Sequence, residues 1–297
     1  MAAGRVLDRR DRPTCQDWGV RGLALPATPA NVPWHMVTGT VAAAHLDAAG
    51  YRRLVVHAPP VAAACGPGQF VMVRAPEWGM LLLSRPFDVY RTDPEAGTLE
   101  ILFKVKGEGT QRLAALRAGD PIHVLGPLGR PVPLPQDGRG VLLVSRGAGV
   151  SPMVRIAQEC AQRGIRARAL VSAASRERLV GIQDLETLGV TVHPLTDDDP
   201  AALRPVQILS GWAAGGEWGA VYVCGSRRLA RAARDVCRAH NLAGYVFVEA
   251  HMACGFGICH GCAVPVRPGP ENPTGQVAYA LACVRGPALP IEEAVLD

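Results

Sequence analysis

Four cysteines near the C-terminal end of this 297-residue sequence carry its clearest chemistry: Cys254, Cys259, Cys262 and Cys283. Their spacing is C-x4-C-x2-C, followed after a longer interval by the fourth cysteine. A [2Fe–2S] cluster takes four thiolates, and this spacing is one of the patterns that supply them. Glycines in the same segment let the chain turn tightly and bring backbone N–H groups close to the sulfurs. The segment therefore predicts an iron–sulfur site and a protein that moves single electrons.

Two other uses of these cysteines remain open from the residues alone. A structural zinc site is one, although zinc ligands usually come as two C-x2-4-C pairs, whereas three cysteines here share one loop. Disulfides are the other, but the chain has nine cysteines, an odd number. Residues 1–12 also lack the apolar stretch of a secretory signal. The spacing favours the cluster over both alternatives.

Composition narrows the class of protein. Hydrophobic residues make up 48% of the chain, which is ample for buried cores in two or three domains. The net charge is +5, but it comes almost entirely from arginines scattered along the chain, so no nucleic-acid surface is expected. No run of about 18 apolar residues is present to span a bilayer. We therefore expect a cytoplasmic protein without membrane or nucleic-acid partners, in a compartment where thiols stay reduced.

Short apolar runs broken by glycine and proline occupy residues 35–137. Runs such as Arg53–His57, Gln69–Arg74 and Thr98–Val105 alternate with period two and are rich in β-branched residues, as strands are. Regularly spaced strands with glycine turns predict a small antiparallel barrel. A short helix is expected over 109–117, closed by Gly119.

The pattern changes over residues 138–247, where buried-strand runs alternate with helical segments. The strand Gly140–Val144 precedes the loop Gly147-Ala148-Gly149, and a helix is expected over 152–162. Further strands are predicted at 168–172, 190–193 and 220–224, with Val246–Glu249 as the last strand of the sheet. Alternation of strand and helix predicts a parallel, doubly wound nucleotide-binding sheet.

The predicted fold class is thus mixed β and α/β, in four segments. They are an N-terminal extension, an antiparallel barrel, a doubly wound parallel sheet and a small C-terminal cluster module, at residues 1–34, 35–137, 138–247 and 248–297.

The segment Arg85-Pro86-Phe87-Asp88 in the barrel resembles the flavin signature Arg-Pro-x-(Ser/Thr) of the ferredoxin–NADP reductase superfamily. The resemblance implies that the arginine meets the FAD pyrophosphate and that the following backbone runs along the isoalloxazine. A guanidinium suits a phosphate because its planar fork donates two parallel hydrogen bonds. Asp88 departs from the family pattern, and a carboxyl group beside the flavin would either disfavour an anionic reduced flavin or be protonated itself.

The strand and turn that begin with Leu102, Phe103 and Lys104 and end with Gly109-Thr110 are similar to the family's diphosphate and ribityl site. A Gly-x-Gly-Thr turn that opens a helix presents backbone N–H groups and a hydroxyl to an anion. The resemblance therefore assigns these five residues to FAD.

The loop after the first strand of the predicted sheet resembles the family's NAD(P) loop. Gly147, Gly149 and Pro152 match that pattern, while Ser145 and Arg146 stand where the family has glycines. These two side chains would either crowd the dinucleotide or, in the case of Arg146, bind its phosphates. The turn at Cys224 resembles the family's Cys-Gly-Pro turn beside the nicotinamide, with serine in place of proline. NAD binding at Gly147, Gly149 and Cys224 is the expectation that follows.

The tail Glu249–Cys262, together with Cys283 in Cys-Val-Arg-Gly-Pro, looks like the electron-transfer subunit of NAD-dependent (class 1B) dihydroorotate dehydrogenase. The resemblance implies a partner catalytic subunit with FMN, a heterotetramer, and a role in pyrimidine biosynthesis. The four cysteines would ligate the cluster, and the chain itself would hold no catalytic base. Reductase subunits of ferredoxin/NAD(P) oxidoreductases and sulfhydrogenases share this layout. A regulatory subunit that has lost NAD binding is a further alternative.

Overall fold

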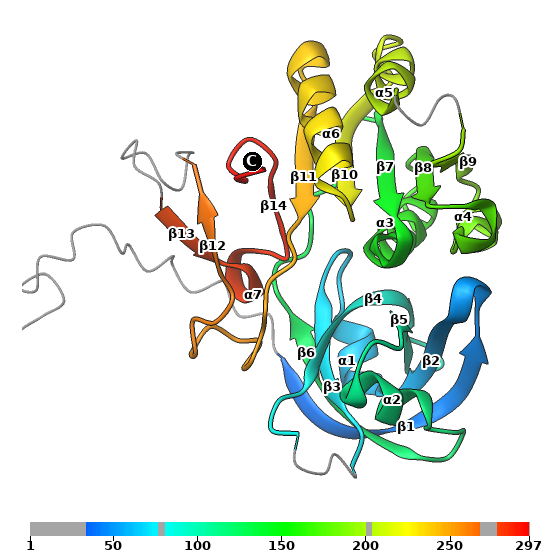
Figure 1. The fold of residues 1–297 in the computed structure, drawn as a ribbon, viewed down its shortest axis with the longest axis vertical. Coiled ribbons are helices and arrows are strands. Elements are labelled where there is room, and N and C mark those ends of the chain that lie inside the picture. Colours follow the sequence, from blue (N-terminus) through cyan, green and yellow to red (C-terminus); the bar gives the residue numbers. More distant parts are fainter. Residues whose placement is uncertain (1–33, 77–80, 200–203, 268–277, 297) are drawn as a thin grey trace, which may run out of the picture.

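The computed structural model describes residues 34–76, 81–199, 204–267 and 278–296. Apart from Trp34, the predicted N-terminal extension lies outside these residues. Figure 1 shows a barrel below, a sheet covered by helices above, and the C-terminal segment beside both. The predicted fold class, with an antiparallel barrel, a doubly wound sheet and a C-terminal module, is confirmed.

Six antiparallel strands close the barrel in the order β1-β2-β5-β4-β3-β6. Apolar side chains that point inward along these strands, among them Val41, Leu54 and Ile101, form its core. The helix α1 lies between β2 and β3, and α2 lies between β5 and β6. The strands and helices are β1 (His35–Leu46), β2 (Tyr51–His57), α1 (Pro59–Ala64), β3 (Phe70–Arg74), β4 (Arg85–Asp93), β5 (Thr98–Lys104), α2 (Glu108–Ala114) and β6 (Pro121–Leu128).

The second sheet has six strands in the order β14-β11-β10-β7-β8-β9. Five of them are parallel, and β14 joins antiparallel to β11. The chain runs outward from β7 to β9 and then returns to the other side of β7, so a topological switch point lies between β7 and β10. The strands are β7 (Gly140–Arg146), β8 (Ala167–Ala173), β9 (Thr191–Thr196), β10 (Trp218–Cys224), β11 (Ala243–Phe247) and β14 (Ala288–Pro290).

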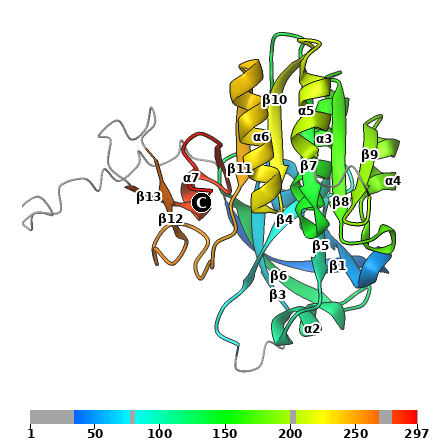
Figure 2. The same ribbon diagram turned by 45° about the horizontal axis from the view of Figure 1, so that its top comes forward.

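Helices cover both faces of this sheet, as Figure 2 shows. Alternate residues of β7 point to opposite faces, so Val141 packs with α3 whereas Leu142 packs with α5 and α6. The α3 side also faces the barrel, because Tyr51 and Tyr90 belong to the same core. The helices are α3 (Val150–Gln162), α4 (Ile182–Thr187), α5 (Pro205–Ala213) and α6 (Arg227–His240), with short 3-10 turns at Ala48–Gly50, Gly147–Gly149 and Arg176–Arg178.

The C-terminal module contains β12 (Ala263–Val266), β13 (Ala278–Leu281) and α7 (Ala282–Arg285), and its chain then enters the sheet as β14. The prediction that the strand near Val246 ends the sheet was therefore wrong. The strand β11 ends at Phe247, and a three-residue strand from beyond the cysteines pairs with its outer edge. This return ties the cysteine segment to the sheet. None of the helices in the described part of the chain combines the length and apolar character needed to cross a bilayer.

Candidate redox site

The four cysteines meet where the C-terminal module packs against the barrel. Cys254, Cys259 and Cys262 lie on the loop between β11 and β12, and Cys283 lies on α7. Cys262 and Cys283 are buried in one apolar cluster with Phe70 of the barrel. The pairing of β12 with β13, followed by α7, thus brings the fourth cysteine to the other three.

The sulfurs are arranged in two pairs. The Cys262 and Cys283 sulfurs are 3.1 Å apart. The Cys254 sulfur accepts hydrogen bonds from the Cys259 side chain and, at 3.5 Å, from the Cys259 backbone N–H. Among the described residues, no three His, Cys, Asp or Glu side chains converge closely enough to hold a single metal ion. A cluster of two irons takes two thiolates for each iron, so two pairs of cysteines fit it better than one zinc ion.

Glycine shapes the loop at Gly255 and Gly257, which have φ angles of +84° and +91°. A Cβ at Gly255 would lie 2.7 Å from Met72 Cγ and 2.9 Å from Leu128 Cδ1, both in the barrel. A Cβ at Gly257 would lie 2.7 Å from Val284, next to Cys283. Both positions need glycine twice over, for the left-handed backbone and for the close contact.

Backbone N–H groups surround the first sulfur of the loop. Burial would raise the pKa of Cys254, but hydrogen bonds from the backbone of Cys259, Phe256 and Ile258 lower it to about 7. A thiol with a lowered pKa is more readily available as the thiolate that iron requires. The residues present therefore fit an iron–sulfur group.

Two of the predicted flavin residues, Arg85 and Gly109, meet at the turn that opens α2. A Cβ at Gly109 would lie 2.9 Å from Arg85 Nε, so the guanidinium lies directly over the turn that opens α2. Arg85 also donates a hydrogen bond to the carbonyl of Leu83. A planar cation held over a glycine turn forms a cradle that a side chain at position 109 would fill, and this cradle fits a diphosphate.

Other predicted flavin residues serve the barrel itself. The Thr110 hydroxyl donates to the carbonyl of Gly107 at 2.8 Å and accepts from the N–H groups of Lys106 and Gly107. These three bonds use its full hydrogen-bonding capacity, so only its backbone is left for a ligand. Phe103 is buried in the barrel core with its ring 5.3 Å from that of Phe87, and Leu102 is buried with Tyr51. Pro86 is half-buried and Lys104 is exposed.

Asp88, Cys224 and Glu249 come together where the barrel, the sheet and the C-terminal module meet. Burial and the nearby Glu249 carboxylate raise the pKa of Asp88 to about 7. Burial, followed by the charges of these two acids, raises the pKa of the Cys224 thiol. The start of α3 holds the group, since the Ser151 hydroxyl donates to the Asp88 carbonyl at 3.1 Å. Asp88 thus favours the protonated form below about pH 7.

The glycine loop after β7 lies against the same group. A Cβ at Gly149 would lie 2.5 Å from the Cys224 carbonyl oxygen, so this glycine allows the turn after β7 to approach the end of β10. Gly147 has a φ of +56°, and its nearest neighbour would be the Tyr51 hydroxyl at 3.0 Å. The loop therefore joins the sheet to the barrel as well as facing the switch point.

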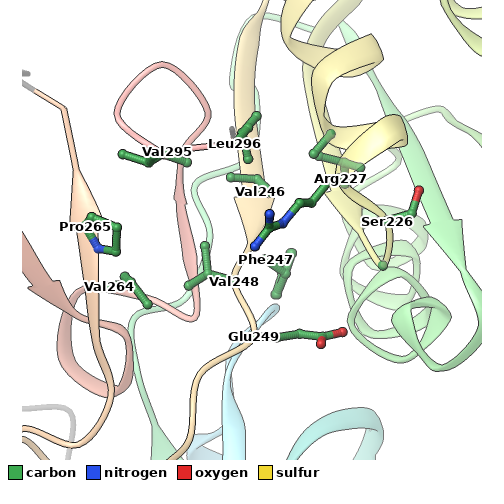
Figure 3. Close-up of a pocket in the computed structure, with 14 residues that line it drawn as sticks. Ser226, Arg227, Val246, Phe247, Val248, Glu249, Val264, Pro265, Val295 and Leu296 are labelled. Atoms are coloured by element: carbon green, nitrogen blue, oxygen red, sulfur yellow. The ribbon is translucent and has the colours of Figure 1, made fainter.

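A pocket of about 440 Å³ separates the first turn of α6 from the C-terminal module (Figure 3). Its walls come from the end of β11, from β12 and from residues 294–296, and most of the residues that line it are apolar. Ser226, Arg227 and Glu249 are its polar members, and Figure 3 shows the Arg227 guanidinium reaching toward β11. Glu249 thus lies both at this junction and beside Asp88.

Sequence reasoning did not assign Glu249 or Tyr51 to the site. Glu249 comes two residues after β11, so its place at the carboxyl end of a parallel strand was a usable signal. Tyr51 gave no such signal. It starts a barrel strand, and its role appears only from the contact between its hydroxyl and the backbone of Ala148.

Comparison with known proteins agrees with this arrangement. The family model "Iron-sulfur cluster binding domain of dihydroorotate dehydrogenase B" matches residues 249–295, and "Oxidoreductase FAD-binding domain" matches residues 51–132. The chain thus carries an FAD-binding domain and an iron–sulfur cluster-binding domain.

Curated relatives match over most of their length. The dihydroorotate dehydrogenase B (NAD(+)) electron transfer subunit of Shouchella clausii is 33% identical over 77% of this chain and 86% of its own length. The subunit of the same name from Geobacillus kaustophilus is 32% identical over 77% of this chain and 87% of its own length.

Solved structures share the fold. A chain of an NADH-dependent reduced ferredoxin–NADP oxidoreductase aligns with a TM-score of 0.72 at 24% identity, over 88% of this chain and 90% of that one. The Amycolatopsis cytochrome P450 reductase aligns with a TM-score of 0.57 at 22% identity, over 71% and 67% of the two chains. At these identities the likeness concerns the fold alone. With the cluster segment, the barrel and the curated relatives in agreement, this chain belongs to the family of dihydroorotate dehydrogenase B electron transfer subunits.

Proposed function

We propose that this chain carries electrons between NAD(H) and a partner catalytic subunit of the dihydroorotate dehydrogenase type, through a [2Fe–2S] cluster and FAD. The observation that carries the proposal is the position of the cluster loop. One side of the loop packs on the barrel through Gly255, and its other side exposes Ile258 and Cys259. A loop placed in this way links a flavin site inside the chain to a partner outside it. The names of the curated relatives support both NAD and the partner.

The cofactors divide along the chain in this proposal. Residues 35–137 hold FAD, 138–247 hold NAD and 248–297 hold the cluster. Cys254, Cys259, Cys262 and Cys283 ligate iron. FAD lies along the barrel residues Arg85, Pro86, Phe87, Asp88, Leu102, Phe103, Lys104, Gly109 and Thr110. NAD approaches over Gly147, Gly149 and Cys224. FAD supplies the exchange between one-electron and two-electron carriers. The chain's own residues position it and keep water from it.

The partner docks, in this proposal, on a cluster-side apolar patch made of Trp34, Met36, Phe256 and Ile258. Trp34 stacks on Phe256 with ring centroids 5.8 Å apart, which ties the start of β1 to the cluster loop. Met36 is the second residue of β1 and lies two residues after Trp34. Met36 and Ile258 are 78% and 75% exposed, which is unusual for apolar side chains beside a redox site and suits a protein interface.

This assembly is a heterotetramer with the catalytic subunit, acts in pyrimidine biosynthesis and works in the cytoplasm. A reducing compartment suits a chain whose thiols bind iron. No membrane or nucleic-acid partner enters the proposal.

Anaerobic co-purification with an FMN-containing dihydroorotate dehydrogenase chain tests the proposal. We expect a stable complex in which NADH bleaches both flavins. Ile258→Glu should weaken the complex at least tenfold, because it places a charge in an apolar interface. Leu46→Glu is the matched control, since Leu46 is also exposed (66%) but lies at the far end of β1. Equal binding of the partner by both variants would show that the patch is not part of the interface. A chain that holds FAD but is not reduced by NADH would contradict the proposed role.

A further inference from the structure

An ion-pair group spans the carboxyl edge of the parallel sheet, apart from the residues assigned above. Arg146 ends β7 and makes a bidentate contact with Asp197, at 3.0 Å and 2.7 Å. Arg228, in the first turn of α6, lies 3.8 Å from Oδ1 of the same carboxylate, the oxygen that Arg146 also contacts. Arg146 is the last residue of β7, Asp197 follows β9, and Arg228 belongs to α6, which follows β10.

This group lies at the switch point of the sheet. Beyond the carboxyl ends of β7 and β10, ligands of doubly wound sheets bind in the crevice where the strand order reverses. The loops after these two strands touch, because a Cβ at Gly225 would lie 2.8 Å from the Arg146 carbonyl oxygen. A side chain from position 146 therefore starts at the crevice.

The charges of the group favour an anion. Two guanidinium groups face one carboxylate, which leaves a positive charge unmatched within the group. A hydrogen bond from Arg146 holds the pKa of Asp197 below its usual range, so the carboxylate stays ionised and in place. The forked contact that Arg146 makes with Asp197 has the geometry that it would make with two oxygens of a phosphate.

We infer that Arg146, assisted by Arg228, binds a phosphate group of the dinucleotide, and that Asp197 occupies the place of that phosphate when no nucleotide is bound. The inference rests on the proposed NAD role. It assigns a role to Arg146, a bulky residue at a position where the family has a glycine that leaves space for the dinucleotide. It also makes Asp197 a competitor of the nucleotide, since the ion pair must break before the phosphate binds.

The phosphate has two sources, the pyrophosphate bridge or a 2′-phosphate on the adenosine ribose. The test titrates the FAD-loaded, cluster-containing protein with ADP-ribose and with its 2′-phosphate, by calorimetry. Both probes lack nicotinamide, so the readout is binding and involves no electron transfer. Arg146→Ala should weaken binding about tenfold, the effect of losing a charge-assisted hydrogen bond. Asp197→Asn should tighten it by roughly twofold to fivefold, because an exposed ion pair contributes little to hold the arginine.

A second ion pair of the same type provides the control. Arg139 binds Asp137 at 2.7 Å, but this pair lies at the opposite end of β7, away from the crevice. Arg139→Ala and Asp137→Asn should leave both affinities unchanged. Equal loss of the two probes in Arg146→Ala identifies the pyrophosphate, and loss of the phosphorylated probe alone identifies the 2′-phosphate. Unchanged affinity in Arg146→Ala would overturn the inference and leave the NAD role standing, whereas wild-type protein that binds neither probe would refute both.

Discussion

The cluster loop and the glycine loop after β7 are both proposed ligand sites, yet they are built differently. In the cluster loop, two glycines pack closely on other parts of the protein: Gly255 on the barrel and Gly257 on α7. At the second loop, Arg146 forms an ion pair with Asp197. The first loop is fixed in shape by packing, whereas in our proposal the second changes its charge partners when a nucleotide binds. A ligand that stays for the life of the protein suits the former, and one that enters and leaves suits the latter.

The largest effect should come from removing a buried ligand of the cluster. Cys262→Ala deletes one of four thiolates, and we expect almost complete loss of iron, sulfide and the visible absorption of the cluster. Cys237→Ala is the control, because Cys237 is equally buried but lies alone on α6. A full complement of iron in Cys262→Ala would contradict the assignment of the loop.

Replacing one glycine in each loop by alanine compares how tightly the two loops are packed. Gly255→Ala should lower the free energy of unfolding by roughly 2–4 kcal/mol, because it adds overlap with Met72 to the cost of a left-handed backbone. Gly147→Ala should cost only about 1 kcal/mol, since its φ is also positive but only the tip of Tyr51 is near. Denaturant unfolding measures both values. Equal losses would show that the cluster loop is not held by the barrel.

Arg85→Ala tests the flavin cradle. Loss of a charge-assisted contact to a diphosphate should weaken FAD binding by about tenfold to a hundredfold, measured by flavin fluorescence on apoprotein. Arg112→Ala is the control, because Arg112 lies on α2, whose first turn Arg85 contacts, but pairs with Glu108 at the surface. Identical affinities of the two variants for FAD would show that Arg85 does not contact the diphosphate.

Asp88 gives a smaller effect that depends on pH. Its pKa rises from 3.8 in the unfolded chain to about 7 in the folded protein, so the stabilisation from its protonated form is complete below pH 3.8 and is lost as pH rises through 7. Asp88→Asn has no such titration. The stability of the variant relative to wild type should therefore rise by roughly 1–2 kcal/mol between pH 4 and 7 and then level off. A difference that stays constant over this range would place the carboxyl in water.

Local patterns predicted the parts of the fold that depend on neighbours in sequence. The helix after β7 was expected over 152–162 and spans Val150–Gln162, because its apolar period and the closing Gly164 are local signals. The strand β14 has three residues and no period of its own, so it is defined only by its pairing with β11. Its existence follows from tertiary packing that no local pattern reports.

The site divides in the same way. The cysteine spacing is a local signal, and the structure brings Cys283 to the other three cysteines. The Thr110 hydroxyl matched a motif but serves its own turn, because the motif does not show which bonds the hydroxyl already makes. Glu249 beside Asp88 and Asp197 beside Arg146 are contacts between distant segments, and only the fold reveals them.

The central claim is that one chain holds both a [2Fe–2S] cluster and FAD, in electronic contact. Anaerobic titration of the purified protein with NADH, followed by visible absorption and electron paramagnetic resonance, tests it directly. We predict two irons and one FAD per chain, bleaching of the flavin, and the signal of a reduced [2Fe–2S] centre in the same titration. A flavin that is reduced while no cluster signal develops, or a chain without the cluster's absorption, would contradict the account.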